Sequence, residues 1–342
     1  MRYPGFLPKN GCVGVIAPSF GCTTEPYASQ FKSAVSFLEG EGYRVLPGEN
    51  CFLDEGTGKS STPEKCGAEI NRFFLGGEAD VLISAGGGET MCEDLGYVDF
   101  EALGKAEPKW FMGYSDNTNL TFLLPTLCDT VAVYGTNFPA FGIRPLPECV
   151  TDSLRLLKGE AFTFKNYSFW EKESLRTPET PLIPYNTAEP FRMTRYPAIE
   201  GPVRFSGRLL GGCLDCLITL CGTKFDRVKA FTEKYREDGI VWFLEACDLD
   251  PVGIRRALWQ LKNAGWFDTA KGFLIGRPLR FDEEAFGLDR CSAVTGILGD
   301  TGLPILMDLD IGHLPPRMPL IEGALAEVSA GENSVSVAMR LR

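Results

Sequence analysis

Three side chains in this sequence form a candidate nucleophile, base and orienting group for covalent catalysis. Ser115 lies in the segment GYSDN between an expected strand and an expected helix, and a serine on such a tight turn is held out from its sheet. His313, the single histidine of the 342 residues, lies in a Gly/Pro loop after an apolar segment, and Glu245 closes the apolar segment WFLE. A serine, a histidine and a carboxylate together are a complete set for acyl transfer.

Each of these residues also has a simpler explanation. Ser115 could begin its helix as an N-cap, Glu245 could face solvent at the end of its strand, and a lone histidine such as His313 is commonly a surface residue or a satisfied core group. The sequence taken one residue at a time leaves both interpretations open. The order Ser, Glu, His at three expected strand ends favours the catalytic one, because sites on open parallel sheets form at the carboxyl ends of strands.

Two backbone segments are candidates for stabilising a developing oxyanion. The amide that follows Ser115, that of Asp116, points toward the place where an oxyanion would form, near the positive end of the helix. The glycine-rich segment SAGGGE lets the backbone approach a ligand closely, and Gly87 or Gly88 could supply a second N–H donor.

Two other motifs resemble known ligand sites but lack essential parts. The segment GTGKS at residues 56–60 looks like the end of a phosphate-binding loop, yet Leu53 stands where the pattern requires glycine. The pair Cys213 and Cys216 has zinc-ligand spacing, but a zinc site needs two further ligands and the chain has one histidine. We therefore expect no metal and no cofactor.

Composition excludes several classes of function. The formal net charge of −11 would repel nucleic acid, and no run of five or more basic residues offsets it. No apolar run approaches the ~20 residues that span a bilayer. The start of the chain lacks an apolar signal segment, so we expect a cytoplasmic protein that binds neither membrane nor nucleic acid, with its 12 cysteines as small, buried, reduced thiols.

Strands and helices alternate along most of the chain, which predicts an α/β protein with a parallel sheet covered on both faces. In the first part we expect strands at residues 13–17, 43–46, 80–84, 109–113 and 131–133, and helices at 25–39, 62–74 and 117–128. In the last part we expect strands at residues 204–210, 239–245, 272–276, 303–307 and within 324–337, and helices at 213–221, 250–263 and 283–298.

The middle of the chain, residues 145–202, is rich in proline, aromatic and charged residues, and we expect no long periodic element there. It is interpreted as a linker with a functional insertion. The expected division is therefore an N-terminal domain at 1–145 that carries the nucleophile, an insertion at 146–203, and a C-terminal domain at 204–342 that carries the glutamate and the histidine.

Several motifs in order resemble the LD-carboxypeptidase family of serine peptidases, particularly its microcin C immunity-protein-like branch. They are GYSDNTNL from residue 113, GGCLDCL from 211, FLE from 243 followed by GIRRAL from 253, and DIGH from 310, with the turn APS from 17. The resemblance covers nearly the whole chain. It implies a Rossmann-like N-terminal domain with a parallel sheet, a C-terminal swivelling β/α domain, and a site between them, often in a homodimer.

The resemblance also implies roles for residues. Ser115 is the implied nucleophile, His313 the general base and Glu245 its orienter, with the amides of Gly88 (or Gly87) and Asp116 as the oxyanion hole. The family's simpler members remove the terminal D-alanine from murein tetrapeptides, whereas the microcin branch cleaves an amide that joins an aminoacyl group to a nucleotide-like moiety.

The microcin branch stacks its nucleotide base on aromatic residues of the loop between the domains. Phe169 and Trp170 are the candidates here, with Gly87 and Gly212 as further substrate contacts, although loop aromatics also serve local packing. The chain departs from that branch in lacking a Trp-rich run just before Arg204. A small peptide and an aminoacyl-nucleotide both remain candidate substrates.

Two rival interpretations belong to other classes. An esterase of the α/β-hydrolase type is disfavoured by Asn117, which replaces the second glycine of the usual nucleophile motif, and by the Gly-Pro loop around His313. A small-ligand binding protein would use the glycine loops without chemistry. Labelling of Ser115 by a fluorophosphonate would favour an enzyme.

Overall fold

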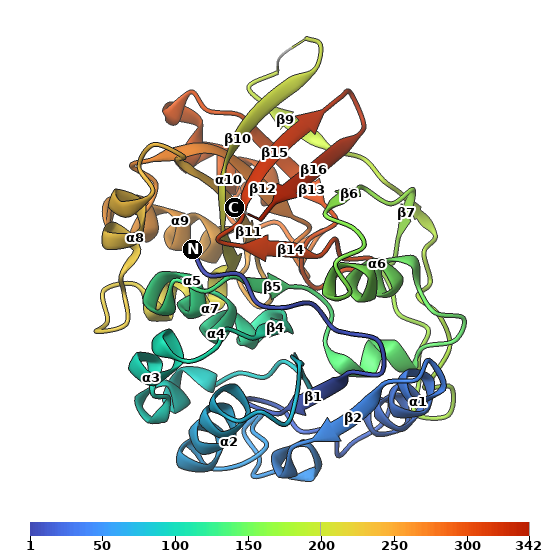
Figure 1. Ribbon diagram of the computed structural model, residues 1–342. Helices are drawn as coiled ribbons and strands as arrows, with labels where there is room; N and C mark the ends of the chain where they lie inside the picture. The colour runs from blue at the N-terminus through green and yellow to red at the C-terminus, as the bar shows by residue number, and fades with distance from the viewer. Residues whose placement is uncertain (199, 342) are drawn as a thin grey trace.

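Two β-sheets form the framework of the chain, and the computed structural model describes residues 1–198 and 200–341 (Figure 1). The first sheet has the strand order β14-β5-β4-β3-β1-β2, and its pairings are parallel except that of β14 with β5. Its strands are β1 (Cys12–Ile16), β2 (Arg44–Pro47), β3 (Val81–Ser84), β4 (Trp110–Gly113), β5 (Ala132–Tyr134) and β14 (Leu320–Glu322). The expected parallel N-terminal sheet is confirmed, with one antiparallel strand added from the far end of the chain.

Helices pack against this first sheet because its strands are apolar on both faces. The helices in this half of the chain are α1 (Tyr27–Gly40), α2 (Pro63–Leu75), α3 (Phe100–Lys105), α4 (Thr118–Thr121), α5 (Leu123–Cys128) and α6 (Glu148–Leu157). The helix expected over 117–128 is divided into α4 and α5 and is preceded by a 3₁₀ turn, Ser115–Asn117. Thr62 precedes α2, but its side chain makes no capping hydrogen bond to the helix backbone.

The second sheet has eight strands in the order β6-β16-β15-β10-β11-β12-β13-β9 and is mixed, with β10, β11, β12 and β13 parallel to one another. Its strands are β6 (Thr163–Lys165), β9 (Thr194–Tyr196), β10 (Val203–Cys213), β11 (Ile240–Glu245), β12 (Ala270–Gly276), β13 (Ile305–Leu309), β15 (Leu325–Ala330) and β16 (Val335–Arg340). Its helices are α7 (Leu214–Leu220), α8 (Val228–Lys234), α9 (Pro251–Asn263) and α10 (Arg290–Leu298).

Three features of the second half differ from the sequence-based expectations. Gly211 and Gly212 continue β10 instead of leading into the next helix. The helix expected from 283 begins only at Arg290, because Gly287 adopts a positive φ and Asp289 caps the helix by accepting the N–H of Ser292. Strand β14 was not expected, since three buried residues give no periodic signal.

The insertion is more ordered than its composition suggests. It contains the ten-residue helix α6, whose buried residues include Val150, Leu154 and Leu157, three and four positions apart as on one helix face. It also supplies β6 and β9, the two edge strands of the second sheet, and a hairpin of β7 (Phe169–Trp170) and β8 (Glu189–Pro190). The ten-residue amphipathic helix α6 contradicts the expectation of no long periodic element there, whereas the strands of the insertion have only two or three residues. The domain boundaries at 145 and 203 remain a prediction.

Strand β14 ties the two halves of the molecule together. It pairs with β5 in the first sheet, and β15, which follows it directly in the sequence, pairs with β10 in the second (Figure 1). This connection brings the carboxyl ends of β4, β5 and β11 to one place, where the candidate site lies.

Candidate active site

Ser115 occupies a strained turn at the carboxyl end of β4. Its φ is +67°, in the left-handed region that a non-glycine residue occupies at a cost of about 1–3 kcal/mol. Hydrogen bonds hold the turn in this shape: the N–H of Ser115 donates to the hydroxyl of Tyr134 at 3.2 Å, and Asn117 Nδ2 donates to the carbonyl oxygens of Gly86 and Tyr114. Side-chain capping by Ser115 is absent, so the N-cap alternative is not what the geometry shows.

Ser115, His313 and Glu245 are in direct contact. Ser115 Oγ lies 2.8 Å from His313 Nε2, and His313 Nδ1 lies 2.9 Å from Glu245 Oε2. Because an ionised carboxylate can only accept, Nδ1 carries the proton and Nε2 is left free to accept the hydroxyl proton of Ser115. Glu245, at the end of β11, is almost completely buried, so the alternative of a solvated strand end is excluded by its position.

Electrostatics favour proton transfer from serine to histidine. Burial works to lower the pKa of His313, but the Glu245 carboxylate and the hydrogen bonds of the ring outweigh burial and hold that pKa well above its ordinary value. Burial likewise works to raise the pKa of Glu245, yet His313 and Tyr134 keep it below its ordinary value. The site therefore stabilises the imidazolium that forms when the histidine takes a proton.

Tyr134, the last residue of β5, closes a ring of hydrogen bonds around these three side chains. Its hydroxyl donates to Glu245 Oε1 at 2.6 Å and accepts the backbone N–H of Ser115. Both oxygens of the buried carboxylate thus have a donor, which burial of a charge requires. Tyr134 lies in an apolar strand like any core tyrosine, so no sequence pattern marks it as part of the site.

The loop that carries His313 is fixed by a buried ion pair and by a glycine. Asp310 pairs with Arg277 and accepts the N–H of Tyr167 at 2.8 Å. Gly312 has φ +101°, and a Cβ there would lie 2.5 Å from Glu245 Oε2, so a side chain would displace the carboxylate from the imidazole. These contacts explain why DIGH is the segment that delivers the histidine.

The candidate oxyanion donors surround the nucleophile. A Cβ on Gly87 would lie 3.0 Å from Ser115 Oγ, so this glycine leaves open the space in front of the hydroxyl. The N–H groups of Gly87 and Gly88 donate to no acceptor within residues 1–198 and 200–341. Asp116 anchors the turn by its buried carboxylate, which accepts from Ser19 Oγ and from the N–H of Met91. The oxyanion role of the Gly88 and Asp116 amides remains a prediction.

A cavity of about 750 Å³ opens onto Ser115 and His313. This large cavity is lined by the glycine loop, by residues of the first domain and by the insertion. Arg317 also lines it, with 7 % of its surface exposed, and its guanidinium donates to the carbonyl oxygens of Gly312 (2.7 Å) and His313 (3.1 Å) and stacks on the ring of Tyr114. The insertion contributes Glu171, Lys172, Ser174, Arg176 and Tyr185.

Three sequence-predicted substrate contacts lie elsewhere. Phe169 is half exposed and Trp170 is buried against Phe281 and Arg277, and neither lines the large cavity. Gly212 is buried in β10, where a Cβ would meet the side chain of Thr118, so it serves close packing between α4 and β10. The insertion thus reaches the cavity, but through residues directly after the two predicted aromatics.

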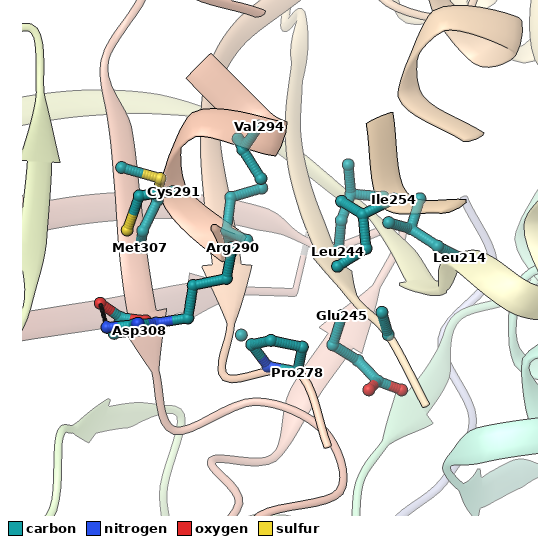
Figure 2. A pocket seen from close by; sticks show the side chains of 13 residues that line it. Leu214, Leu244, Glu245, Ile254, Pro278, Arg290, Cys291, Val294, Met307 and Asp308 are labelled. Carbon is teal, nitrogen blue, oxygen red and sulfur yellow. Dashed lines mark hydrogen bonds and ion pairs between the residues drawn. The ribbon is translucent and has the colours of Figure 1, made fainter. Parts of the chain in front are cut away.

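A second, apolar pocket of about 20 Å³ lies behind the catalytic candidates, between β11, β12 and α10 (Figure 2). Figure 2 shows that the carboxylate of Glu245 points away from its apolar lining, which includes Leu244, Ile254 and Val294. Arg290 and Asp308 form an ion pair at its other end. This pocket therefore lies against the strand that carries Glu245, and Ser115 is not among its lining residues.

The motifs that resembled ligand sites are occupied by protein contacts. Lys59 pairs with Glu93, and Ser60 donates to the carbonyl oxygen of Ala17, so neither side chain is free for a phosphate. In the part of the chain that the structure describes, no group of three His, Cys, Asp or Glu side chains is arranged to hold a metal ion, and no helix is long and apolar enough to cross a membrane.

Comparison with solved structures supports the fold. The chain superposes on the microcin C7 self-immunity protein MccF with bound adenosine monophosphate (TM-score 0.81, 20 % identity, 98 % of both chains). It superposes equally on an MccF-like protein from Bacillus anthracis (TM-score 0.81, 20 % identity, 99 % and 100 % of the chains). The two-domain α/β architecture is therefore that of the MccF-like proteins.

Sequence comparison identifies the family. The chain is 26 % identical to the "Probable murein peptide carboxypeptidase" of Bacillus subtilis over 98 % of its own length and 93 % of the relative's. The model of the LD-carboxypeptidase N-terminal domain matches residues 13–135, and that of the LD-carboxypeptidase C-terminal domain matches residues 206–328. With the matches spanning both halves and the site between them, the chain belongs to the LD-carboxypeptidase family.

Proposed function

We propose that this protein is a serine-type carboxypeptidase that cleaves an amide bond next to a carboxyl-terminal residue. The observation that carries the proposal is the continuous contact from Ser115 through His313 to Glu245, on a turn strained at the serine. A binding protein has no need to hold a serine hydroxyl against an imidazole in this way. Family membership and the strand order of the first sheet both argue against an esterase of the α/β-hydrolase type.

The geometry supports a two-step acyl transfer. His313 Nε2 accepts the proton of Ser115 Oγ as this oxygen bonds to the scissile carbonyl carbon, and the resulting oxyanion faces the amides of Gly88 and Asp116. The imidazolium then donates its proton to the departing nitrogen as the C–N bond breaks, leaving an acyl ester on Ser115. A water molecule, deprotonated by His313, attacks this ester, and the acid is released with the serine restored.

Arg317 supports cleavage at a carboxyl terminus. It is a buried guanidinium that lines the large cavity and forms no ion pair in the described residues; its nearest acceptors are neutral carbonyl oxygens. A buried cation without a counter-charge destabilises the protein. A carboxylate of the substrate would supply that counter-charge. The carboxyl group of the leaving residue is the group that we assign to Arg317.

A murein-type peptide is the first candidate substrate. Phe169 and Trp170, the aromatics expected to stack a base, lie outside the cavity lining, and the Bacillus subtilis relative is named for murein peptide. An aminoacyl-nucleotide is the second candidate, because solved relatives carry adenosine monophosphate and glutamyl sulfamoyl guanosine and the cavity is large enough for a nucleotide. The cytoplasmic location and the homodimer remain predictions.

The test is a direct comparison of the two substrates. Purified protein is incubated with a murein tetrapeptide that ends in D-alanine and, separately, with an aminoacyl sulfamoyl-adenosine, and the products are identified by mass spectrometry. We expect release of D-alanine from the tetrapeptide and much slower release of D-alaninamide from the same peptide with its terminal carboxyl group amidated. If neither compound is cleaved and a fluorophosphonate does not label Ser115, the results favour a small-ligand binding protein over an enzyme.

A further inference from the structure

Ser19 is a buried residue in the loop that follows β1, and this loop lies next to the loops that carry the candidate oxyanion donors. Strands β1, β3 and β4 are neighbours and parallel in the first sheet, so the loops at their carboxyl ends are adjacent (Figure 1). The loop after β3 carries Gly88, and the loop after β4 carries Ser115 and Asp116. Ser19, with 1 % of its surface exposed, is therefore close to both candidate amides.

The hydroxyl of Ser19 holds the side chain of Asp116. Ser19 Oγ donates to Asp116 Oδ2, which also accepts the backbone N–H of Met91 at 2.9 Å. The other oxygen, Oδ1, accepts Nδ2 of Asn119 at 3.0 Å. Donors from three segments of the chain thus fix this carboxylate, and the backbone N–H of the same residue is fixed with it.

The same hydroxyl packs against the backbone of Gly88. A Cβ on Gly88 would lie 2.0 Å from Ser19 Oγ and 2.5 Å from the carbonyl oxygen of Gly58, so only a hydrogen atom fits between them. The next residue, Phe20, donates its backbone N–H to the carbonyl oxygen of Gly87 at 2.7 Å. The contact and the hydrogen bond together fix the glycine loop relative to the loop after β1.

These contacts matter because the two candidate donors belong to different loops. An oxyanion hole stabilises the transition state only when its donors are already held where the oxyanion will form. Ser19 touches both loops, so its hydroxyl sets the spacing between the amides of Gly88 and Asp116. Ser19 is not among the lining residues of the large cavity, so it acts through these amides and not by contact with a substrate.

We propose that Ser19 is a positioning residue that holds the amides of Gly88 and Asp116 at the spacing an oxyanion requires. The proposal rests on the proposed function, because it takes Ser115 as the nucleophile and these amides as the oxyanion donors. It also gives a role to the APS turn at residues 17–19, which no other part of the site explains.

The variant Ser19→Ala removes the hydroxyl and keeps a small side chain. We expect it to fold, because the carboxylate of Asp116 keeps the donors from Met91 and Asn119. For D-alanine release from a murein tetrapeptide we expect kcat to fall about 10- to 100-fold, since a misplacement of about 1 Å in an active site can cost about 10²-fold. We expect KM to change by less than about threefold, because no substrate contact is removed. Rates are expressed per Ser115 that a fluorophosphonate labels at completion, so that a partly folded sample is not mistaken for a slow one.

Ser153→Ala is the matched control. It also removes the hydroxyl of a fully buried serine, which donates to the carbonyl oxygen of Cys149 at 2.9 Å within α6. Ser153 is not among the lining residues of the large cavity, and we expect kcat and KM of this variant to equal those of the wild type.

Two binding measurements separate positioning of the oxyanion hole from general loosening of the site. In a peptidyl trifluoromethyl ketone, Ser115 Oγ bonds to the ketone carbon, His313 takes the hydroxyl proton, and the ketone oxygen becomes an oxyanion. Its Ki therefore reports on the oxyanion hole, and we expect Ser19→Ala to weaken it by about the same factor as kcat. The Kd of the tetrapeptide, measured by calorimetry in Ser115→Ala with and without Ser19→Ala, is expected to agree within about twofold.

The outcomes distinguish this proposal from the proposed function. An active wild type with an unchanged kcat in Ser19→Ala would overturn the role of Ser19 and leave the proposed function standing. Equal weakening of Ki and Kd, or an equal loss of kcat in Ser153→Ala, would also overturn it, because the effect would then be general loosening. A wild type that neither releases D-alanine nor reacts with the fluorophosphonate at Ser115 would overturn the proposed function, and this inference with it.

Discussion

Replacing Glu245 by glutamine tests how the carboxylate controls His313. The glutamate is buried and accepts two hydrogen bonds, from His313 Nδ1 at 2.9 Å and from the Tyr134 hydroxyl at 2.6 Å. Glutamine has nearly the same shape, but one of its two terminal atoms is an NH₂ group that cannot accept. If the NH₂ group faces the imidazole, Nδ1 must accept, and the ring proton moves to Nε2, where it blocks transfer from Ser115.

The size of the loss in kcat/KM follows from the orientation of the glutamine amide. The Tyr134 hydroxyl already accepts the N–H of Ser115, so its own proton is directed to residue 245, and this favours the amide oxygen on the tyrosine side. The imidazole then faces the NH₂ group and holds the wrong tautomer. Loss of the correct tautomer in a serine triad costs about 10⁴-fold in kcat. We expect a loss of this size in kcat/KM.

The pH dependence changes with the same substitution. Neutral His313 is the active base, so kcat/KM rises as pH rises through the histidine pKa. In the wild type, burial lowers this pKa but Glu245 outweighs it, which places the rise above pH 6.5. In Glu245→Gln the carboxylate is gone and burial remains, so the rise moves to lower pH.

The assay is D-alanine release from a murein tetrapeptide between pH 5 and 9.5, with circular dichroism as a check on folding. A variant within tenfold of the wild type at the plateau, or one whose rise stays at the wild-type pH, would refute the role given to Glu245. The double variant Glu245→Gln/Tyr134→Phe removes the competing hydroxyl and is expected to recover part of the lost rate.

Three further predictions concern single buried side chains. Tyr134→Phe removes one hydrogen bond to a buried charge and should lower kcat/KM about 10- to 100-fold and shift its acid-side rise, measured in the same assay. Arg317→Gln should reduce the preference for a free terminal carboxylate over its amide toward unity, measured as the ratio of kcat/KM values; an unchanged ratio contradicts the assignment. Burial raises the pKa of Glu322 to about 8, so the wild type loses stability as pH rises from about 4.5 to 8, and Glu322→Gln should be more stable above pH 8, on the order of 5 kcal/mol by denaturant unfolding, with no gain at pH 4.5.

The sequence located the three catalytic candidates because each lies in a short local motif. GYSDN and DIGH lie at the ends of apolar strands and WFLE closes one, and the expected alternation of strands and helices places such ends at one edge of the sheets. The contact between His313 and Glu245, 68 positions apart, depends on the packing of β11 against the loop after β13. The order of motifs indicated this contact, and the structure supplies its geometry.

Other parts of the site depend on tertiary packing that leaves no local pattern. Tyr134 looks like a core tyrosine in its strand, and only strand β14, which draws the two sheets together, brings it to Glu245. Arg317 looks like any surface arginine until Tyr114 covers it. Trp170 was expected at the substrate because it is aromatic and in a loop. Its ring instead packs against Phe281, where more of its apolar surface is buried than at the wall of a cavity.

We propose Ser115 as the nucleophile in amide cleavage. The most direct measurement is rapid quenching of the protein with its best murein-type peptide, followed by peptide mapping by mass spectrometry, with Ser115→Ala assayed in parallel. We expect a transient acyl group on Ser115 and a loss of turnover of several orders of magnitude in a folded Ser115→Ala variant. Near wild-type turnover in that variant, or an acyl group on another residue, would contradict it.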